Sequence, residues 1–499
     1  MATRRRADLS GASAKIDAES RPADSPGQQS NPERETIFAP STAAGRAGVA
    51  VVRVSGPGAG ALLRAVTGGE LPTPRRATLV ALRDPRDGRT IDRALVLWFP
   101  APRSFTGEDM AELHLHGGLA VSAAAIEALA AVEGVRLARP GEFTRRAFDN
   151  GKLDLAEVEG LADLIAAETE AQRRQALQQM EGALSQRIEA WRHRLIQILA
   201  LVEAEIDFPD EDLPGGLAEA AREEIGDLIK EIKGVTVDAE KGERLREGLQ
   251  VAIVGPPNVG KSSLLNALAR RDVAIVSPGA GTTRDVIELH MDLAGYPVTL
   301  ADTAGLRQLE EGSADGVSMA VEAEGMRRAR ARAEMADLRL AVLDLANWQE
   351  PGPDVMALLE QGAFLVLNKV DLAGGEQVRA QLQGDPALIP AAVRSAAKRG
   401  RAFAVSARSG EGIDALLRAL TAAAAEAMEI GAGGGITRAR HRQALEGCLA
   451  SLENSLSAGG VELAAEDLRL AARALGEVIG RVDVEDVLDA LFADFCIGK

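Results

Sequence analysis

Several residue types that mark particular classes of protein are scarce in this chain. Only two of its 499 residues are cysteine, Cys448 and Cys496, so a disulfide framework is excluded. Aromatic residues make up 3% of the chain, and no apolar run has the length of a transmembrane helix. The net charge is -17, which argues against a general affinity for nucleic acid, because that affinity comes largely from neutralising phosphates. Any RNA contact therefore needs a local basic patch or a second protein.

The length and the 46% hydrophobic content are sufficient for two to four domains, each with its own core. Residues 1–35 are rich in Arg, Ala, Ser, Pro, Asp and Gly, a composition that predicts a disordered extension. Asp8, Asp17 and Glu19 in this extension argue against an organelle transit peptide, because such peptides avoid acidic residues. We expect a cytoplasmic protein.

The most informative segment is Gly255-Pro-Pro-Asn-Val-Gly-Lys-Ser262, which has the pattern G-x-x-x-x-G-K-S. It follows an apolar strand-like run, 251–254, and precedes a Leu-rich helical run, 263–269. A Gly-rich turn lets backbone N–H groups curl around phosphates, and the helix N-terminus adds a favourable partial charge. Lys261 is placed to reach the β- and γ-phosphates and Ser262 to bind Mg²⁺. The segment predicts a nucleotide triphosphate site.

Three later segments indicate which nucleotide binds. Asp302-Thr-Ala-Gly305 follows a strand, where the Asp can hold Mg²⁺ through water and the Gly N–H can sense the γ-phosphate. Asn368-Lys-Val-Asp371 follows a second buried strand, and its carboxylate can accept both N–H groups of guanine, which favours GTP over ATP. Ser406-Ala407 follows a third strand and can brace the guanine carbonyl. Together these segments resemble the GTP-binding domain of Ras-like and Era-like GTPases.

The catalytic water has no obvious partner in this set. The residue after Gly305 is Leu306, which replaces the Gln that orients water in Ras-like enzymes and has no donor or acceptor. Hydrolysis therefore needs a group from elsewhere. Thr283 in 281–285 is the natural switch-I ligand of Mg²⁺. For Asn258 two interpretations stay open: a ligand of a monovalent cation beside the phosphates, or an Asn that braces the loop.

The order of patterns predicts a multidomain chain of mixed class. An α+β domain spans 36–152, with strands expected at 49–54, 94–99 and 111–116 and a helix at 119–132. An α-helical domain is expected from 153–248 together with 436–499, and an α/β P-loop GTPase domain, 249–430, is inserted in it. In the helical part Leu195, Ile198, Leu199 and Val202 follow 3–4 spacing.

Beyond the GTPase motifs, the chain from Thr36 to its end resembles the MnmE (TrmE) family of tRNA wobble-uridine modification GTPases. Four groups of residues carry the resemblance: Gly45-Arg-Ala-Gly48 to Val54-Ser-Gly56; Ser104-Phe-Thr-Gly-Glu-Asp109 with His116-Gly-Gly118; Arg139-Pro-Gly-Glu-Phe-Thr144 with Ala147-Phe148, Asn150 and Lys152-Leu-Asp-Leu155; and Phe495-Cys-Ile-Gly-Lys499.

The resemblance implies that the N-terminal α+β domain mediates dimerisation and binds 5-formyl- or 5,10-methylenetetrahydrofolate. Matching motif by motif, the folate contacts are Arg53, Glu112, Lys152 and Lys499. A pterin edge suits a carboxylate, and the glutamate tail of folate suits Arg or Lys. From the sequence alone, a sheet-surface ion pair is the favoured interpretation of Arg53 and Glu112. Cys496 has no neighbouring base in sequence, so its role stays open.

The resemblance also implies a GTPase that depends on potassium and is activated when two G domains meet. It favours cation binding by Asn258, with Ser277, Gly279 and Thr282 completing the K⁺ site. Glu322 is then the catalytic residue that positions water, with Glu324 as its competitor, although the segment 306–318 is longer than the family's usual one. The full set of expected GTP and GDP contacts is Asn258, Val259, Gly260, Lys261, Ser262, Ser263, Ser277, Thr282, Thr283, Asp302, Gly305, Asn368, Lys369, Asp371, Ser406 and Ala407.

The implied function is the addition of an aminomethyl or carboxymethylaminomethyl group to C5 of uridine-34 in certain tRNAs. The implied partners are a second copy of the chain, an MnmG-like FAD protein in a heterotetramer, and tRNA, with no membrane. Two other classes stay open. A ribosome-assembly GTPase like Era or Der predicts a basic KH-like appendage, and a dynamin-like GTPase predicts an apolar or basic tip on helical arms. Neither class accounts for Arg53, Glu112 and the Cys-Ile-Gly-Lys end.

Overall fold

The computed structural model describes residues 35–207, 217–271, 273–275, 288–302, 335–345, 352–372, 375, 391–429, 435–482 and a few positions from 487 to 498. Contacts divide the chain into two compact units. One runs to Ser104 and from Glu108 to Ala138; the other holds Phe105–Gly107 and the chain from Arg139 onward. None of the helices within the described ranges is long and apolar enough to span a membrane.

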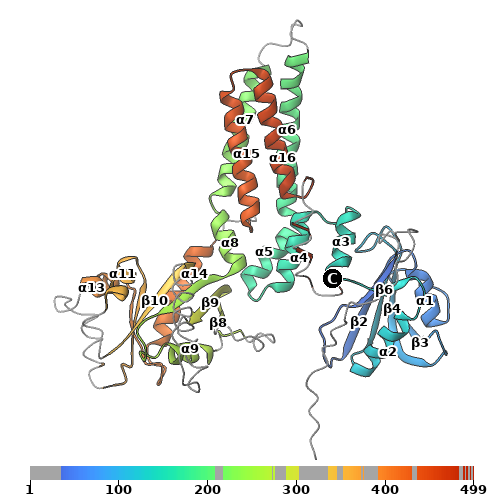
Figure 1. Cartoon of the computed structure of the whole chain (residues 1–499), viewed down its shortest axis with the longest axis horizontal. Coiled ribbons are helices and arrows are strands. Elements are labelled where there is room, and N and C mark those ends of the chain that lie inside the picture. Colours follow the sequence, from blue (N-terminus) through green and yellow to red (C-terminus); the bar gives the residue numbers. More distant parts are fainter. Residues whose placement is uncertain are drawn as a thin grey trace, which may run out of the picture. The chain divides into compact units, whose positions relative to one another are not determined.

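The first unit is a six-stranded sheet in the order β3-β4-β5-β2-β1-β6, with only the β1–β6 pair parallel (Figure 1). Two helices cover one face of the sheet, and the core between the sheet and these helices contains Val52, Leu113 and Trp98. The three strands and the helix expected here from the sequence are present. The elements are β1 (Thr36–Pro40), β2 (Val49–Ser55), α1 (Ala59–Thr67), β3 (Thr78–Arg83), β4 (Thr90–Phe99), β5 (Met110–His116), α2 (Leu119–Ala130) and β6 (Val135–Leu137).

The second unit contains a helical part whose two segments are far apart in sequence. The first part of the helical segment expected from residue 153 is divided into three helices, α4, α5 and α6, because the chain is extended at Ala167 and turns at Gly182 with φ +83°. Thr169 and Gln172 form a capping box that starts the middle helix. The helices are α3 (Glu142–Asp149), α4 (Leu155–Ala166), α5 (Glu170–Met180), α6 (Ala183–Asp207), α7 (Leu217–Thr236), α8 (Ala239–Glu247), α15 (Ala439–Ser457) and α16 (Val461–Val478).

One hydrophobic core joins the helices before and after the inserted domain. Leu195 and Ile198 of α6 are 1% and 2% exposed, and they share this core with Leu452 of α15 and Leu475 of α16. Figure 1 shows α15 and α16 (red) lying beside α6 and α7 (green). The spacing of apolar residues in 195–202 therefore marks the buried face of α6, as expected.

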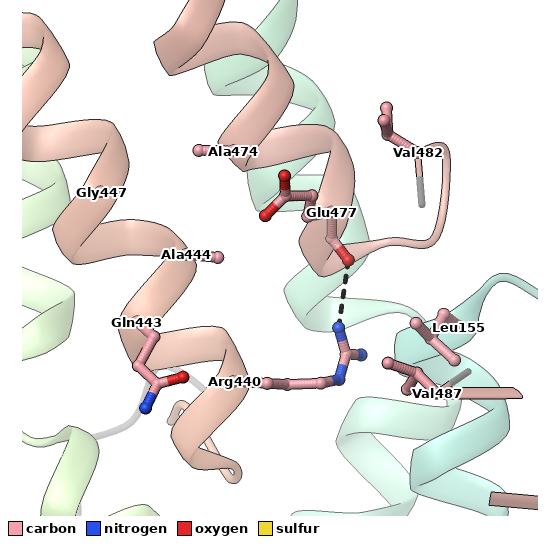
Figure 2. Close-up of a pocket in the computed structure, with 9 residues that line it drawn as sticks. All are labelled: Leu155, Arg440, Gln443, Ala444, Gly447, Ala474, Glu477, Val482 and Val487. Carbon is pink, nitrogen blue, oxygen red and sulfur yellow. Dashed lines mark hydrogen bonds between the residues drawn. The ribbon is translucent and has the colours of Figure 1, made fainter. Parts of the chain in front are cut away.

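A buried charge cluster fastens α4 to α15. The carboxylate of Glu159 is 2% exposed and accepts two 2.6 Å hydrogen bonds from Arg440 and one of 2.8 Å from the Nε2 of His441. The Arg440 guanidinium also donates to the backbone carbonyls of Glu477 and Val478. It lies at the edge of a cavity of about 310 Å³ between α15 and α16, where Figure 2 shows it beside Leu155.

The same unit holds a second six-stranded sheet, in the order β12-β11-β10-β7-β9-β8, parallel except for the β8–β9 hairpin. The expected fold class, an α+β N-terminal part with a helical part that contains an α/β part, is confirmed. The elements of this α/β part are β7 (Leu249–Val254), α9 (Lys261–Ala269), β8 (Glu288–Leu293), β9 (Tyr296–Asp302), β10 (Leu338–Asp344), α11 (Pro353–Glu360), β11 (Phe364–Asn368), α13 (Ala391–Lys398), β12 (Ala402–Ala404) and α14 (Ile413–Met428).

Candidate GTP-binding site

The phosphate loop connects the end of β7 to the start of α9. Gly260 has φ +94°, a conformation that favours glycine, and it directly precedes the first turn of α9. The side chain of Lys261 is 7% exposed and folds back over the loop, where its Nζ donates 2.8 Å hydrogen bonds to the carbonyls of Gly255 and Pro256. The loop therefore encloses an ammonium group at a helix N-terminus, a combination suited to anionic oxygens.

Asn368, at the end of β11, braces two loops of the site. Its Nδ2 donates 2.9 Å to the carbonyl of Val259 in the phosphate loop, and its Oδ1 accepts 3.0 Å from the N–H of Ala407. A Cβ on Gly260 would lie 2.3 Å from the Nδ2 of Asn368, so only glycine fits beside this brace. Asn368 is 2% exposed, and both ends of its amide are held by the protein backbone.

Asp371 and Ser406 meet at the neighbouring strand ends. The Oγ of Ser406 donates a 2.7 Å hydrogen bond to the Oδ1 of Asp371, and it accepts one of 3.1 Å from the N–H of Ser409. The hydrogen bond from Ser406 lowers the pKa of the Asp371 carboxyl, so this exposed group is ionised at neutral pH. An anchored carboxylate is suited to accept the two N–H groups of a guanine edge.

Lys369 joins the base end of the site to the phosphate end. It has φ +67°, and its Nζ donates 2.7 Å to the backbone carbonyl of Asn258, which has φ +65°. The same Nζ lies 3.4 Å from the Oδ2 of Asp344. Asp344 was not among the site residues predicted from the sequence. Its position at the end of β10, the strand between β7 and β11, was the available signal.

The structure thus brings together the residues at the carboxyl ends of β7, β11 and β12, as expected for a parallel sheet. Asp302 ends β9 opposite Ile253 of β7, which places its backbone beside the phosphate loop. The remaining switch and cation residues named from the sequence fall outside the described ranges; they are Ser277, Gly279, Thr282, Thr283, Gly305, Leu306, Glu322 and Glu324.

In the N-terminal sheet, Arg53 of β2 lies directly opposite Glu112 of β5. The Nη2 and Nε of Arg53 lie 3.1 and 3.3 Å from the Oε1 of Glu112, and the Nε2 of His114 is 3.4 Å from its Oε2. The ion pair is partly exposed on the face that the helices leave open. Lys152 is exposed in the other unit, and Lys499 lies outside the described residues.

A phosphate loop, an Asn-Lys-x-Asp segment and a Ser-Ala loop on one parallel sheet define a P-loop GTPase. The sequence match identifies which one. A family model described as the MnmE helical domain matches residues 155–496, and one described as the GTP-binding protein TrmE N-terminus matches residues 36–152. The chain belongs to the MnmE family of tRNA modification GTPases.

Relatives in this family are similar over nearly their whole length. The tRNA modification GTPase MnmE of Parvibaculum lavamentivorans is 56% identical over 473 residues, which cover 93% of this chain and 100% of that protein. The protein of the same name from Rhodospirillum rubrum is 52% identical over 477 residues, 93% of this chain and 99% of that one. A crystal structure of a GTP-binding protein from Sulfolobus solfataricus with GDP is 17% identical, with a TM-score of 0.25, over 47% of this chain and 67% of that one.

Proposed function

We propose that this GTPase works with an MnmG-like flavoprotein in the cytoplasm to add an aminomethyl or carboxymethylaminomethyl group to C5 of uridine-34 in certain tRNAs. A tetrahydrofolate would supply the one-carbon unit. The observation that carries the proposal is one chain in which the TrmE N-terminal domain and the MnmE helical domain accompany an assembled guanine-nucleotide site. GTP hydrolysis would drive movement of the G domain rather than supply the bond-forming chemistry.

On the nucleotide, the described residues support distinct roles. Lys261 and the loop around it would hold the β- and γ-phosphates, and Asp371, anchored by Ser406, would select guanine. Asn368 would act through the two loops that it holds together. Mg²⁺ at Ser262 and Thr283 would neutralise phosphate charge, and K⁺ at Asn258, Ser277, Gly279 and Thr282 would add positive charge where other GTPases use an arginine.

The proposed folate site uses the Arg53–Glu112 pair, with Lys152 and Lys499. Glu112 accepts from Arg53 through Oε1, and its Oε2 lies 3.4 Å from the Nε2 of His114; a pterin N–H would donate to the same carboxylate. The same sheet face exposes apolar side chains, with Val49 53%, Leu79 58% and Leu95 47% exposed. Exposed apolar area of this kind supports the proposal that the N-terminal domain dimerises.

The folate proposal is tested by binding of 5-formyltetrahydrofolate to the full-length chain, followed by calorimetry. Glu112→Gln is expected to weaken binding by about tenfold or more, because a charge-assisted hydrogen bond is lost. Arg93→Met is the matched control, since Arg93 lies on β4 in the register of the same face but away from the pair. Equal affinity of wild type and Glu112→Gln would remove Glu112 from the site.

The catalytic proposal is tested by GTP turnover in KCl and in NaCl at equal ionic strength. Turnover is expected to be faster in KCl, and Glu322→Ala is expected to lower kcat by about a hundredfold, whereas Glu324→Ala should leave it nearly unchanged. Equal rates in the two salts would defeat the potassium site. A loss confined to Glu324→Ala would transfer the catalytic role to that residue.

Modification itself is tested with the chain, the flavoprotein, undermodified tRNA, methylenetetrahydrofolate and GTP, by mass spectrometry of the tRNA nucleosides. The expected product is a uridine-34 nucleoside with a C5 substituent, formed only when GTP is hydrolysed. A product that forms equally well with a non-hydrolysable GTP analogue would overturn the role assigned to hydrolysis.

A further inference from the structure

Helix α5 contacts the β8–β9 hairpin of the G domain and both linkers that join the G domain to the helical core. Its N-terminal end meets the hairpin of β8 and β9: the N–H of Ala171 donates 3.2 Å to the carbonyl of Gly295, and the Oε2 of Glu168 lies 3.1 Å from the Nδ1 of His290. Ala171 also packs against the core of the G domain. The hairpin turn, Ala294–Gly295, has positive φ at both residues, which makes it a tight and well-defined contact.

This hairpin lies between the two segments of sequence that contain the expected switch residues. Strand β8 begins at Glu288, soon after Thr283, and β9 ends at Asp302, where the second switch segment begins. A change in either switch on GTP hydrolysis would therefore act on a strand of the hairpin that α5 contacts.

A row of glutamines on α5 holds both linkers of the G domain. Gln172 and Gln175 donate 3.0 and 3.1 Å hydrogen bonds to the carbonyls of Arg246 and Gly242 in α8, the helix that leads into the G domain. Gln179 accepts 2.7 Å from the hydroxyl of Thr437, in the segment that leads out of it. Gln175 and Gln179 are 9% and 4% exposed, so these hydrogen bonds are screened from water and costly to break.

The two linkers also contact each other. The Nε of Arg246 donates 3.0 Å to the carbonyl of Thr437, and a Cβ on Gly242 would lie 1.9 Å from the carbonyl of Ile436. Because no side chain fits between them, the incoming and outgoing linkers form one tightly packed pair against the glutamine face of α5. Movement of the G domain about its linkers must therefore act on α5.

The other end of α5 is fixed to α4. The Nε2 of Gln179 donates 2.9 Å to the carbonyl of Ala156, and a Cβ on Gly160 would lie 2.5 Å from the backbone nitrogen of Met180. In turn, Leu155 and Val158 of α4 pack against Phe492 near the C-terminus. This connects α5 to the end of the chain that carries Cys496 and Lys499.

We infer that α5 couples the nucleotide state of the G domain to the helical core, with Gln172, Gln175 and Gln179 as positioning residues. The inference extends the GTPase activity and does not depend on folate or tRNA. Helix α5 contacts the hairpin and linkers of the G domain and is also fixed to α4, so a shift of the hairpin or linkers acts on α4 through it. The nucleotide state should therefore alter the protection of α4 and α15 against hydrogen exchange.

The test is hydrogen exchange of full-length chain in GDP and in GDP with fluoroaluminate, Mg²⁺ and K⁺. In wild type, peptides 155–166 and 439–457 are expected to exchange at different rates in the two states. Gln175→Met retains the shape of the side chain but removes the amide, and it is expected to reduce that difference by about fivefold, the effect of one lost neutral hydrogen bond. Nucleotide affinity should stay within about twofold of wild type, because Gln175 does not belong to the site.

Gln178→Met is the matched control, because Gln178 is exposed on the same helix. It should retain the full nucleotide-dependent difference. If Gln175→Met does not fold, Gln172→Met tests the neighbouring hydrogen bond in the same way. If the residues act on one route, the Gln175→Met/Gln179→Met chain should lose little more than the stronger single variant. The inference is overturned if wild type shows no difference between the two states, if a folded Gln175→Met or Gln172→Met chain keeps it, or if Gln178→Met loses it equally.

Discussion

The buried cluster around Glu159 yields a quantitative prediction for Glu159→Gln. The substitution keeps the size of the side chain but removes the charge that Arg440 and His441 contact. The amide would also turn an NH₂ group toward one of these donors. Arg440 would retain its hydrogen bonds to the carbonyls of Glu477 and Val478, so its guanidinium would lose only part of its hydrogen bonding. The variant therefore measures the contribution of one buried carboxylate to holding α4 on α15.

Two lines of reasoning give a similar value for the free energy of unfolding that Glu159→Gln would lose. Burial raises the pKa of Glu159, but hydrogen bonds from His441 and Arg440 outweigh it and bring the pKa to about 2, from an ordinary value of 4.5. That difference corresponds to about 3 kcal/mol at neutral pH, with little loss to solvent screening, because the residue is 2% exposed. Removing one partner of a buried ion pair generally costs about 3–5 kcal/mol. We expect Glu159→Gln to destabilise the helical core by about 3 kcal/mol.

The same cluster predicts how stability depends on pH. A lowered carboxyl pKa contributes stability that is complete above pH 4.5 and is lost as the pH falls toward 2, so the difference between wild type and Glu159→Gln should narrow below pH 4.5. Burial lowers the pKa of His441 below 6.5, which keeps its ring neutral with Nε2–H donating to Glu159. Below pH 6.5 the unfolded chain takes up a proton that the folded chain does not, so both proteins lose stability there. Arg438 and Asp163 also face the cluster.

Hydrogen exchange in peptides from α4 and α15 is the suitable assay, since a multidomain chain does not unfold in a single step. Glu446→Gln is the control: Glu446 lies on α15, the helix of Arg440 and His441, is 55% exposed and pairs with Arg442 at 3.6 Å, so its substitution should cost under about 1 kcal/mol. Replacing both Glu159 and Arg440 by Met should recover part of the loss, because no charge is left unpaired. If Glu159→Gln costs no more than Glu446→Gln, the role assigned to the cluster is wrong.

Two further predictions concern the nucleotide site. Gly260→Ala should weaken GTP binding by about a hundredfold in a fluorescent-nucleotide titration. Its Cβ would lie 2.3 Å from the Nδ2 of Asn368, and the φ of +94° is strained for alanine. Gly226→Ala on α7 is the control, because its Cβ meets open space, and it should bind GTP normally. Asp371→Asn should lower GTP affinity by about a hundredfold or more and raise that for xanthosine triphosphate, measured by competition; an unchanged preference for guanine would mean that another group reads the base.

Much of the nucleotide site was predictable because its parts are short and continuous. The phosphate contacts proposed for Gly255 to Ser262 use mainly consecutive backbone groups, so their pattern is visible without a fold. The order of strands and loops then predicted an α/β domain, since parallel strands bring their carboxyl ends to one edge. The brace formed by Asn368 and the pairing of Lys369 with Asp344 were not predictable, because each joins loops that are remote in sequence.

The helical part shows the same division. Local periodicity determined which face of α6 is buried, because one helix turn sets the positions of its own side chains. Only tertiary structure decided that Glu159 would be paired with Arg440 and His441, across the whole inserted domain, and that the glutamines of α5 would hold both linkers. A sequence specifies the donors and acceptors that a residue carries; the partner that excludes water from them is chosen when distant segments pack together.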